Sequence, residues 1–167
     1  MTEITLTQLL DSRDARQQKQ KELLRQYSRT LVCLTVVFPG SVKRTENSLI
    51  VANAAMAALQ QCRDCKFTVI EEHDLDTGFE GYLLSPLSAK ETKRITCELE
   101  ECHPLGRLFD IDVITPECIP IKREDVGFAP RRCLLCDNEV RYCMRNKTHT
   151  QKELLSRINE IVDEYQQ

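Results

Sequence analysis

The sequence lacks tryptophan, and aromatic residues make up only 5% of its 167 residues. Single-stranded nucleic acids are bound largely by stacking bases on aromatic side chains, and every nucleic acid favours a basic surface. The formal net charge is −3. The composition therefore argues against a protein that binds nucleic acid.

Long apolar runs are also missing. A membrane-spanning helix needs about 20 mostly apolar residues in succession, and no run in this chain approaches that length. Residues 1–5 have neither the basic start nor the apolar stretch of a secretory signal. We therefore expect a cytoplasmic protein with no membrane partner.

Cysteine, by contrast, is abundant: there are nine. An odd number in a chain without a secretory signal favours reduced thiols over a disulfide framework. Three of the thiols and one imidazole fall within 17 residues near the C-terminus: Cys133, Cys136, Cys143 and His149. These ligand types suit a tetrahedral Zn²⁺ site. Their spacing departs from common zinc fingers, so a group of reduced thiols without metal is the alternative.

Apolar residues make up 41% of the chain, enough to form the core of one domain over residues 1–167. Hydrophobic spacing and turn residues predict helices over 5–27, 46–61 and 150–165, and another that begins at Ser85 or Ser88 and ends near Cys102. Strands are predicted over 31–38, 67–72, 82–84, 109–114 and 119–122. A glycine-marked loop is expected over 76–81.

This order predicts an α+β fold. Its mixed, mostly antiparallel sheet has the ferredoxin-like β-α-β-β-α-β order, with additional N- and C-terminal helices. Within the domain, we expect an N-terminal helix over 1–28, an α/β core over 29–125, and a cysteine-rich segment with the last helix over 126–167.

The strand predicted over 109–114 alternates apolar and acidic residues. Asp110 and Asp112 then share one face, about 6–7 Å apart, and both carboxylates can reach one Mg²⁺ ion. A solvated strand face is the alternative. Aspartate is disfavoured in strands, however, so two aspartates in one short strand suggest a function. Arg107 lies just upstream, where it can neutralise a phosphate or pair with a carboxylate.

Cationic residues elsewhere add to this interpretation. Arg13, Arg16 and Gln20 share one face of the first predicted helix, which is either a solvated face or a phosphate-binding one. Lys43 follows a Pro39-Gly40 turn, just before a helix whose N-terminus favours anions. Residues 122–147 hold seven basic and four acidic residues, so this segment can meet phosphate or an acidic partner protein.

Several of these motifs together resemble the CitX family. The stretches that carry the resemblance are His-Pro-Leu-Gly-Arg-Leu-Phe-Asp-Ile-Asp-Val at 103–113 and Pro-Arg-Arg-Cys-Leu-Leu-Cys at 130–136, followed by Cys143, Arg145 and His149. Arg13, Arg16, Gln20, Lys43 and the Thr77-Gly78 region agree as well, so the resemblance covers nearly the whole chain. Ser41 is a departure, because many members have proline there.

The resemblance implies a bacterial nucleotidyltransferase of citrate fermentation. Members take 2′-(5″-triphosphoribosyl)-3′-dephospho-CoA and attach its phosphoribosyl-dephospho-CoA part to a serine of the acyl carrier (γ) subunit of citrate lyase, releasing pyrophosphate. The expected partners are therefore that subunit and that triphosphate.

On this hypothesis each candidate residue has a role. Asp110 and Asp112 bind Mg²⁺, and Arg107 stabilises charge in the transition state. Arg13, Arg16, Gln20 and Lys43 hold the substrate phosphates. His103 either helps to deprotonate the acceptor serine or is a helix-end histidine favoured by the helix dipole.

Two other classes of function fit the sequence less well than a transferase. A non-catalytic module that docks an acidic carrier protein through the basic segment has no use for paired aspartates. A small zinc-ribbon nucleic-acid-binding protein is disfavoured by the negative net charge and the scarcity of aromatic residues.

Overall fold

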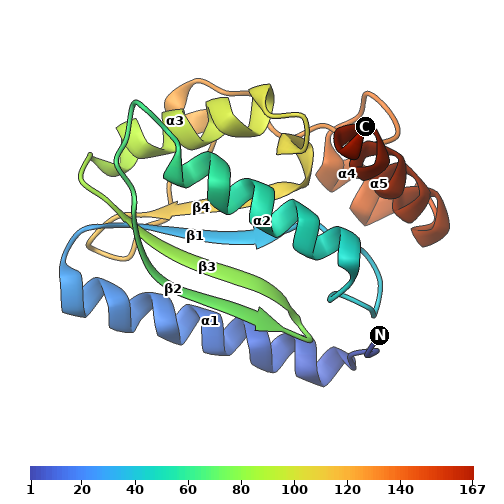
Figure 1. Ribbon diagram of the computed structural model, residues 1–167, viewed down its shortest axis with the longest axis horizontal. Coiled ribbons are helices and arrows are strands. Elements are labelled where there is room, and N and C mark those ends of the chain that lie inside the picture. Colours follow the sequence, from blue (N-terminus) through green and yellow to red (C-terminus); the bar gives the residue numbers. More distant parts are fainter.

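Four strands form one antiparallel sheet in the computed structural model, which describes residues 1–167 (Figure 1). The strands are β1 (Thr30–Val36), β2 (Thr68–Leu75), β3 (Gly78–Ser85) and β4 (Phe109–Ile114). Their order across the sheet is β2-β3-β1-β4, and every neighbouring pair is antiparallel. β4 is therefore an edge strand.

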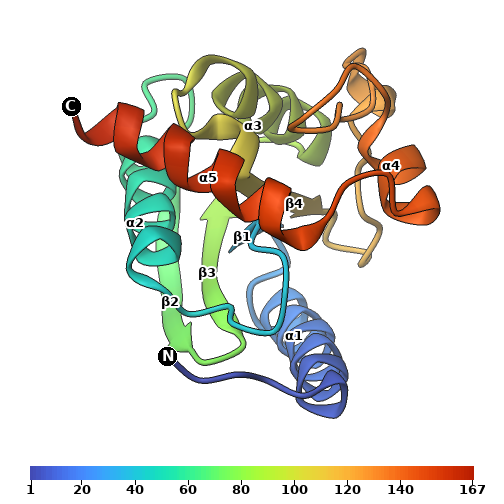
Figure 2. The same ribbon diagram turned by 90° about the vertical axis from the view of Figure 1, so that its right-hand side faces the viewer.

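Helices cover both faces of this sheet (Figures 1 and 2). Three lie on one face: α2 (Glu46–Gln60), α3 (Ala89–Cys102) and α5 (Gln151–Gln166). α1 (Leu6–Tyr27) lies on the other face, and the short α4 (Val140–Asn146) lies to one side. The predicted α+β class is confirmed, as is the β-α-β-β-α-β order of elements from β1 to β4.

Some details of the sequence prediction are wrong. The sheet is entirely antiparallel rather than mixed. The loop predicted over 76–81 is only a turn at Asp76-Thr77, because β2 and β3 are longer than expected and form a continuous hairpin. Gly78 takes a φ of 118°, which other residues rarely adopt, and this permits the tight turn.

The fifth strand predicted over 119–122 does not form. Only an isolated bridge joins Ile114 to Pro120, and the amide of Ile121 donates to the carbonyl of Val113. Proline has no N–H to contribute to a ladder, which limits pairing at this point. α4 was not predicted, because seven mostly exposed residues carry no recognisable apolar stripe.

Four of the helices begin in the same way. In each, a threonine or serine accepts the N3 amide, and the N3 side chain accepts the amide of the capping residue: Thr5, Thr45, Ser88 and Thr150. Each such capping box satisfies two backbone donors that the helix leaves unpaired, and typically contributes about 1 kcal/mol. Local sequence therefore fixes where these helices start.

The core has two parts of unequal size. The larger lies between the sheet and α2, α3 and α5, and receives Phe109, Ile111 and Val113 from β4. The smaller lies between α1 and the sheet and includes only Leu23 and Leu24 from the helix. The N-terminal half of α1 thus has little apolar contact with the sheet, and this is where the candidate site lies.

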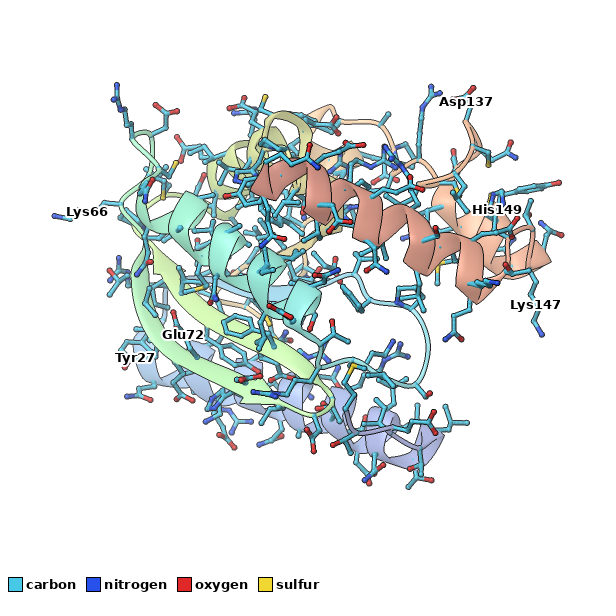
Figure 3. All side chains as sticks on the ribbon, turned by 45° about the vertical axis from the view of Figure 1, so that its right-hand side comes forward. Tyr27, Lys66, Glu72, Asp137, Lys147 and His149 are labelled. Carbon is cyan, nitrogen blue, oxygen red and sulfur yellow. The ribbon has the colours of Figure 1, made fainter.

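Most charged side chains lie on the outside of the molecule, as Lys66, Glu72, Asp137 and Lys147 illustrate (Figure 3). No helix of the structure combines the length and the apolar character needed to cross a membrane.

Candidate active site

The two aspartates of β4 share one face of the sheet, as the alternation predicted. The neighbouring apolar residues point into the larger core, so the side chains of Asp110 and Asp112 lie on the opposite face, the one that α1 covers. Asp110 is paired with Thr35 of β1, whose hydroxyl donates to its carboxylate at 3.2 Å. Neither aspartate is in an ion pair, so both carboxylates are available to a cation.

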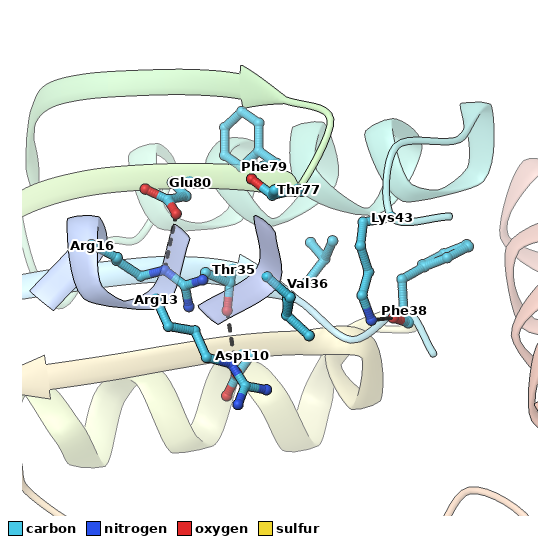
Figure 4. Close-up of a pocket in the computed structure, with 12 residues that line it drawn as sticks. Arg13, Arg16, Thr35, Val36, Phe38, Lys43, Thr77, Phe79, Glu80 and Asp110 are labelled. Carbon is cyan, nitrogen blue, oxygen red and sulfur yellow. Dashed lines mark hydrogen bonds and ion pairs between the residues drawn. The ribbon is translucent and has the colours of Figure 1, made fainter. Parts of the chain in front are cut away.

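A cavity lies between the N-terminal half of α1 and the sheet (Figure 4). Its charged lining comes from three elements and the loop after β1: Arg13 and Arg16 from α1, Glu80 from β3, Asp110 from β4, and Lys43 from the loop. It encloses about 140 Å³. Pockets for whole drug-sized ligands enclose about 300–1,000 Å³, so this one suits a short phosphate chain rather than an entire nucleotide.

Arg16 is held in place by the protein. Its Nε donates to Glu80 Oε1 at 3.0 Å, and the hydroxyl of Tyr82 donates to the other oxygen of Glu80 at 2.7 Å. Glu80 and Tyr82 are both buried. This chain of hydrogen bonds fixes one guanidinium at the wall of the cavity.

Arg13 and Lys43 have no acidic partner in the same cavity. Lys43 donates only to the carbonyl of Phe38, at 2.6 Å, and Arg13 forms no ion pair. Burial, together with the nearby Arg13 charge, lowers the pKa of Lys43. Two cations that repel each other across a cavity indicate a site that is completed by an anion.

Like charges also lie close together on β4, where the Asp110 and Asp112 carboxylates repel each other. The pKa of Asp112 is raised, first because the surrounding protein removes water from it and then because the Asp110 carboxylate is close. A bound divalent cation relieves repulsion of this kind, and two aspartate oxygens are ligands that Mg²⁺ accepts. The donor set therefore fits a Mg²⁺ ion.

This crowding predicts a gain of stability in Asp112→Asn. Because the pKa is raised on folding, ionising the carboxyl costs free energy in the folded state that it does not cost in the unfolded chain. The penalty develops as the pH rises above the ordinary value of 3.8 and is complete above the folded pKa. Without metal, the variant should unfold at a higher temperature than the wild type at neutral pH.

Thermal unfolding across the acid and neutral range checks this expectation. The difference should vanish when the pH is low enough to protonate the carboxyl in both states. Asp163→Asn is the matched control, since that residue is exposed on α5 and has no ion pair. A lower unfolding temperature for Asp112→Asn at neutral pH would contradict the assignment.

Side chains from α3 hold the outer edge of β4, which sequence reasoning missed. Lys93 donates to the carbonyl of Ile111 at 2.8 Å, and Glu100 accepts the amide of the same residue at 3.2 Å. Both side chains are buried. The backbone between the two aspartates is thus bonded on the side where the sheet offers no further strand.

Two arginines complete this arrangement. Glu100 forms ion pairs with Arg123 at 2.5 Å and with Arg131 at 2.7 Å. Arg131 also donates to the carbonyl of Phe109. Gly106 lies against the C-terminal turn of α3, where a side chain would collide with the Glu100 carbonyl. These contacts fix the position of β4 from its start.

Comparison with known proteins agrees with the sequence motifs. The model of the CitX family, described as apo-citrate lyase phosphoribosyl-dephospho-CoA transferase, matches residues 4–165. A protein of that name from Escherichia coli O1:K1 is 38% identical over an alignment of 164 residues that covers 96% of this chain and 90% of the relative. A protein of the same name from Shigella boydii serotype 18 has the same identity and coverage.

The chain belongs to the CitX family. The resemblance found in the sequence is thereby confirmed. Of the residues that it implied for the site of a CitX protein, the cavity brings together Arg13, Arg16, Lys43 and Asp110, and Asp112 follows on the same strand face. Segments far apart in the sequence therefore meet at one place in the fold.

Other candidates of the CitX resemblance lie away from the cavity. Arg107 donates to the backbone carbonyls of Arg132 and Cys133, the latter at 3.0 Å, and is therefore engaged by the cysteine-rich segment. Gln20 lies farther along α1, next to the buried thiol of Cys33. Neither side chain lines the cavity.

His103 lies at the C-terminal end of α3 and packs against Phe109, with 4.8 Å between the ring centroids. Since Phe109 belongs to the larger core, His103 lies on the opposite face of the sheet from Asp110. Its Nδ1 accepts the amide of Leu105, and burial lowers its pKa. This surrounding favours a neutral, structural helix-end histidine.

The cysteine-rich segment gathers its candidate ligands as well. One ligand atom from each of the four predicted residues lies within 4.8 Å of the others: Cys133, Cys136, Cys143 and His149. The group is separate from the cavity, which none of the four lines.

Proposed function

We propose that this chain transfers the 2′-(5″-phosphoribosyl)-3′-dephospho-CoA group from its triphosphate precursor to a serine of the apo acyl carrier (γ) subunit of citrate lyase. Membership of the CitX family supports the reaction class. The observation that carries the proposal is the cavity in which Arg13 and Lys43 lack acidic partners beside the Asp110 carboxylate. A polyphosphate needs both cationic groups and a site for its metal.

In this proposal the cationic wall of the cavity binds the β- and γ-phosphates, which leave as pyrophosphate. Arg16 is already oriented by Glu80, so it loses little freedom when it binds. Arg13 and Lys43 gain the anion that they lack. Together these side chains stabilise the charge that builds up on the leaving group.

The acceptor reacts at the open side of the cavity. The serine oxygen forms a bond to the α-phosphorus, the bond between the α-phosphorus and the bridging oxygen of pyrophosphate breaks, and the hydroxyl proton leaves to solvent. Asp110 and Asp112 would hold Mg²⁺, which when bound neutralises phosphate charge and aligns the α-phosphate. Thr35 orients Asp110 through its hydrogen bond.

The proposed reaction is tested by mass spectrometry of the carrier subunit. Incubation of the chain with the apo γ subunit, the triphosphate precursor and Mg²⁺ should add one phosphoribosyl-dephospho-CoA group and release one pyrophosphate. A carrier whose acceptor serine is replaced by alanine should gain no mass. A stable complex without any gain of mass would instead support the docking module.

Arg13→Met should weaken the binding of pyrophosphate about 10-fold or more, because one charge-assisted hydrogen bond typically contributes about 1.5–3 kcal/mol. Inhibition of transfer by added pyrophosphate measures this affinity. Arg25→Met is the matched control, since Arg25 is exposed near the other end of the same helix and has no ion pair. If pyrophosphate inhibits the wild type, Arg13→Met and Arg25→Met equally, Arg13 does not bind the phosphates.

A further inference from the structure

The stretch between β4 and the middle of α5 has almost no core of its own. From residue 115 to residue 157, only Cys133 and Cys143 are buried. A segment of this length cannot be held in one conformation by apolar burial when so few side chains leave water. Short domains with this deficit are commonly stabilised by a disulfide or by a metal ion.

The buried thiols belong to a group of four ligand atoms, which we call the thiol-imidazole cluster: Cys133, Cys136, Cys143 and His149. The sulfurs of Cys136 and Cys143 are 3.4 Å apart, and His149 Nε2 is 3.4 Å from the Cys136 sulfur. In a tetrahedral site with Zn–S bonds of about 2.3 Å, neighbouring sulfurs are about 3.8 Å apart. The sulfurs of Cys136 and Cys143 need to separate by only a few tenths of an ångström to reach that distance, and all four ligand atoms already lie within 4.8 Å of one another.

The backbone around the cluster is already shaped to present these atoms. The amide of Cys133 donates to the carbonyl of Asn138 at 2.8 Å, and the amide of Val140 donates to the carbonyl of Arg131 at 2.8 Å, which closes a tight loop. Inside this loop, the amide of Leu135 donates to the Cys133 sulfur at 3.5 Å. Donors of this kind stabilise a thiolate that binds metal.

The last ligand is brought back by a turn. α4 carries Cys143 and ends at Lys147, which adopts a left-handed conformation with a φ of 49°. The amide of Thr148 then donates to the Cys143 carbonyl at 3.1 Å, which turns the chain toward the cluster. His149 follows at the junction with α5, as Figure 3 shows.

We propose that the thiol-imidazole cluster binds one Zn²⁺ ion through all four of its side chains and that this ion is structural. Four protein ligands close a tetrahedral site and leave no position for a substrate. A disulfide between Cys136 and Cys143 is the rival arrangement. It accounts for two of the four groups, but leaves the convergence of Cys133 and His149 unexplained.

The ion would act on the candidate active site through the backbone. Arg107, just before β4, donates to the carbonyls of Arg132 and of the ligand Cys133. Arg131, in the same loop, donates to the carbonyl of Phe109 at the start of β4. Metal binding would therefore help to fix the strand that carries Asp110. The zinc site itself does not depend on the proposed transferase reaction.

Metal analysis of the untagged 167-residue chain, purified under reducing conditions without added zinc, tests the proposal. We expect about one Zn²⁺ per chain. After removal of zinc by a chelator, Co²⁺ should restore one equivalent, with the visible absorption of a tetrahedral ion and a thiolate charge-transfer band. Chelation should also lower the unfolding temperature and expose residues 128–150 to protease.

The variants separate this site from adventitious binding. Cys136→Ser and Cys143→Ser should each lose most of the bound zinc, while Cys118→Ser, which changes an exposed thiol outside the cluster, should keep it. If the reduced wild-type chain holds far less than one Zn²⁺ and gives no tetrahedral Co²⁺ spectrum, the proposal is wrong. Loss of zinc from Cys118→Ser would equally overturn the assignment of ligands.

Discussion

Asp110→Asn and Asp112→Asn are each expected to slow transfer to the carrier subunit by at least about 100-fold while leaving the fold intact. Each change removes one charged oxygen ligand from a pair of carboxylates that face α1 and have no ion pair. The rate is measured from the gain of mass of the apo carrier over time. Asp163→Asn, an exposed and unpaired aspartate on α5, should transfer at the wild-type rate.

A second measurement separates loss of the metal from loss of the fold. A ligand that binds only the folded state raises the unfolding temperature, so Mg²⁺ should stabilise the wild type. The same addition should have little effect on either asparagine variant, although Asp112→Asn alone is expected to be more stable without metal. Near-normal transfer by either variant in the presence of Mg²⁺ would show that the aspartates are not the metal ligands.

The sequence was informative wherever one local rule decides the structure. The alternation of apolar and acidic residues predicted that Asp110 and Asp112 face away from the core, and the structure confirms this. The helices predicted to begin at residues 5 and 150 have Thr5 and Thr150 as their N-caps, each with a capping partner three residues later. In the same way, the three-residue spacing of Arg13 and Arg16 put both guanidiniums on the face of α1 that lines the cavity.

The sequence was less informative about residues whose role depends on which segments meet. The sequence assigned no role to Glu80 or Thr35, because their partners lie 64 and 75 residues away. Arg107 is three positions from Asp110, yet the 3₁₀ turn before β4 directs it to the cysteine-rich segment. His103 is near the aspartates in sequence but packs on the other face of the sheet.

At the outer edge of β4, the residue with the most partners is one that the sequence does not distinguish from its neighbours. Glu100 is 4% exposed and appears in the sequence as one of several acidic residues near the end of a charged helix. In the fold, it accepts the Ile111 amide and neutralises the guanidiniums of Arg123 and Arg131. Only the tertiary structure reveals that this one carboxylate has three partners.

Glu100→Gln is therefore expected to destabilise the protein by about 3–5 kcal/mol, because it leaves the guanidinium of Arg131 without its counter-charge and leaves Arg123 with Glu101 as its remaining acidic partner. The exposed Glu98 on the same helix provides the matched control, and Glu98→Gln should change the free energy of unfolding by less than about 0.5 kcal/mol. Urea unfolding of both variants measures the difference. Equal stabilities would show that the ion pairs of Glu100 are not stabilising.

If Glu100 also positions Asp110 and Asp112, its replacement should change a property that does not depend on overall stability. Under conditions where Glu100→Gln is fully folded, the backbone of Ile111 has lost one charged acceptor, so the two flanking carboxylates are held less firmly. We then expect transfer to need more Mg²⁺ for half-maximal rate, while inhibition by pyrophosphate at the Arg13 side stays unchanged. An unchanged Mg²⁺ requirement would limit Glu100 to stabilising the fold.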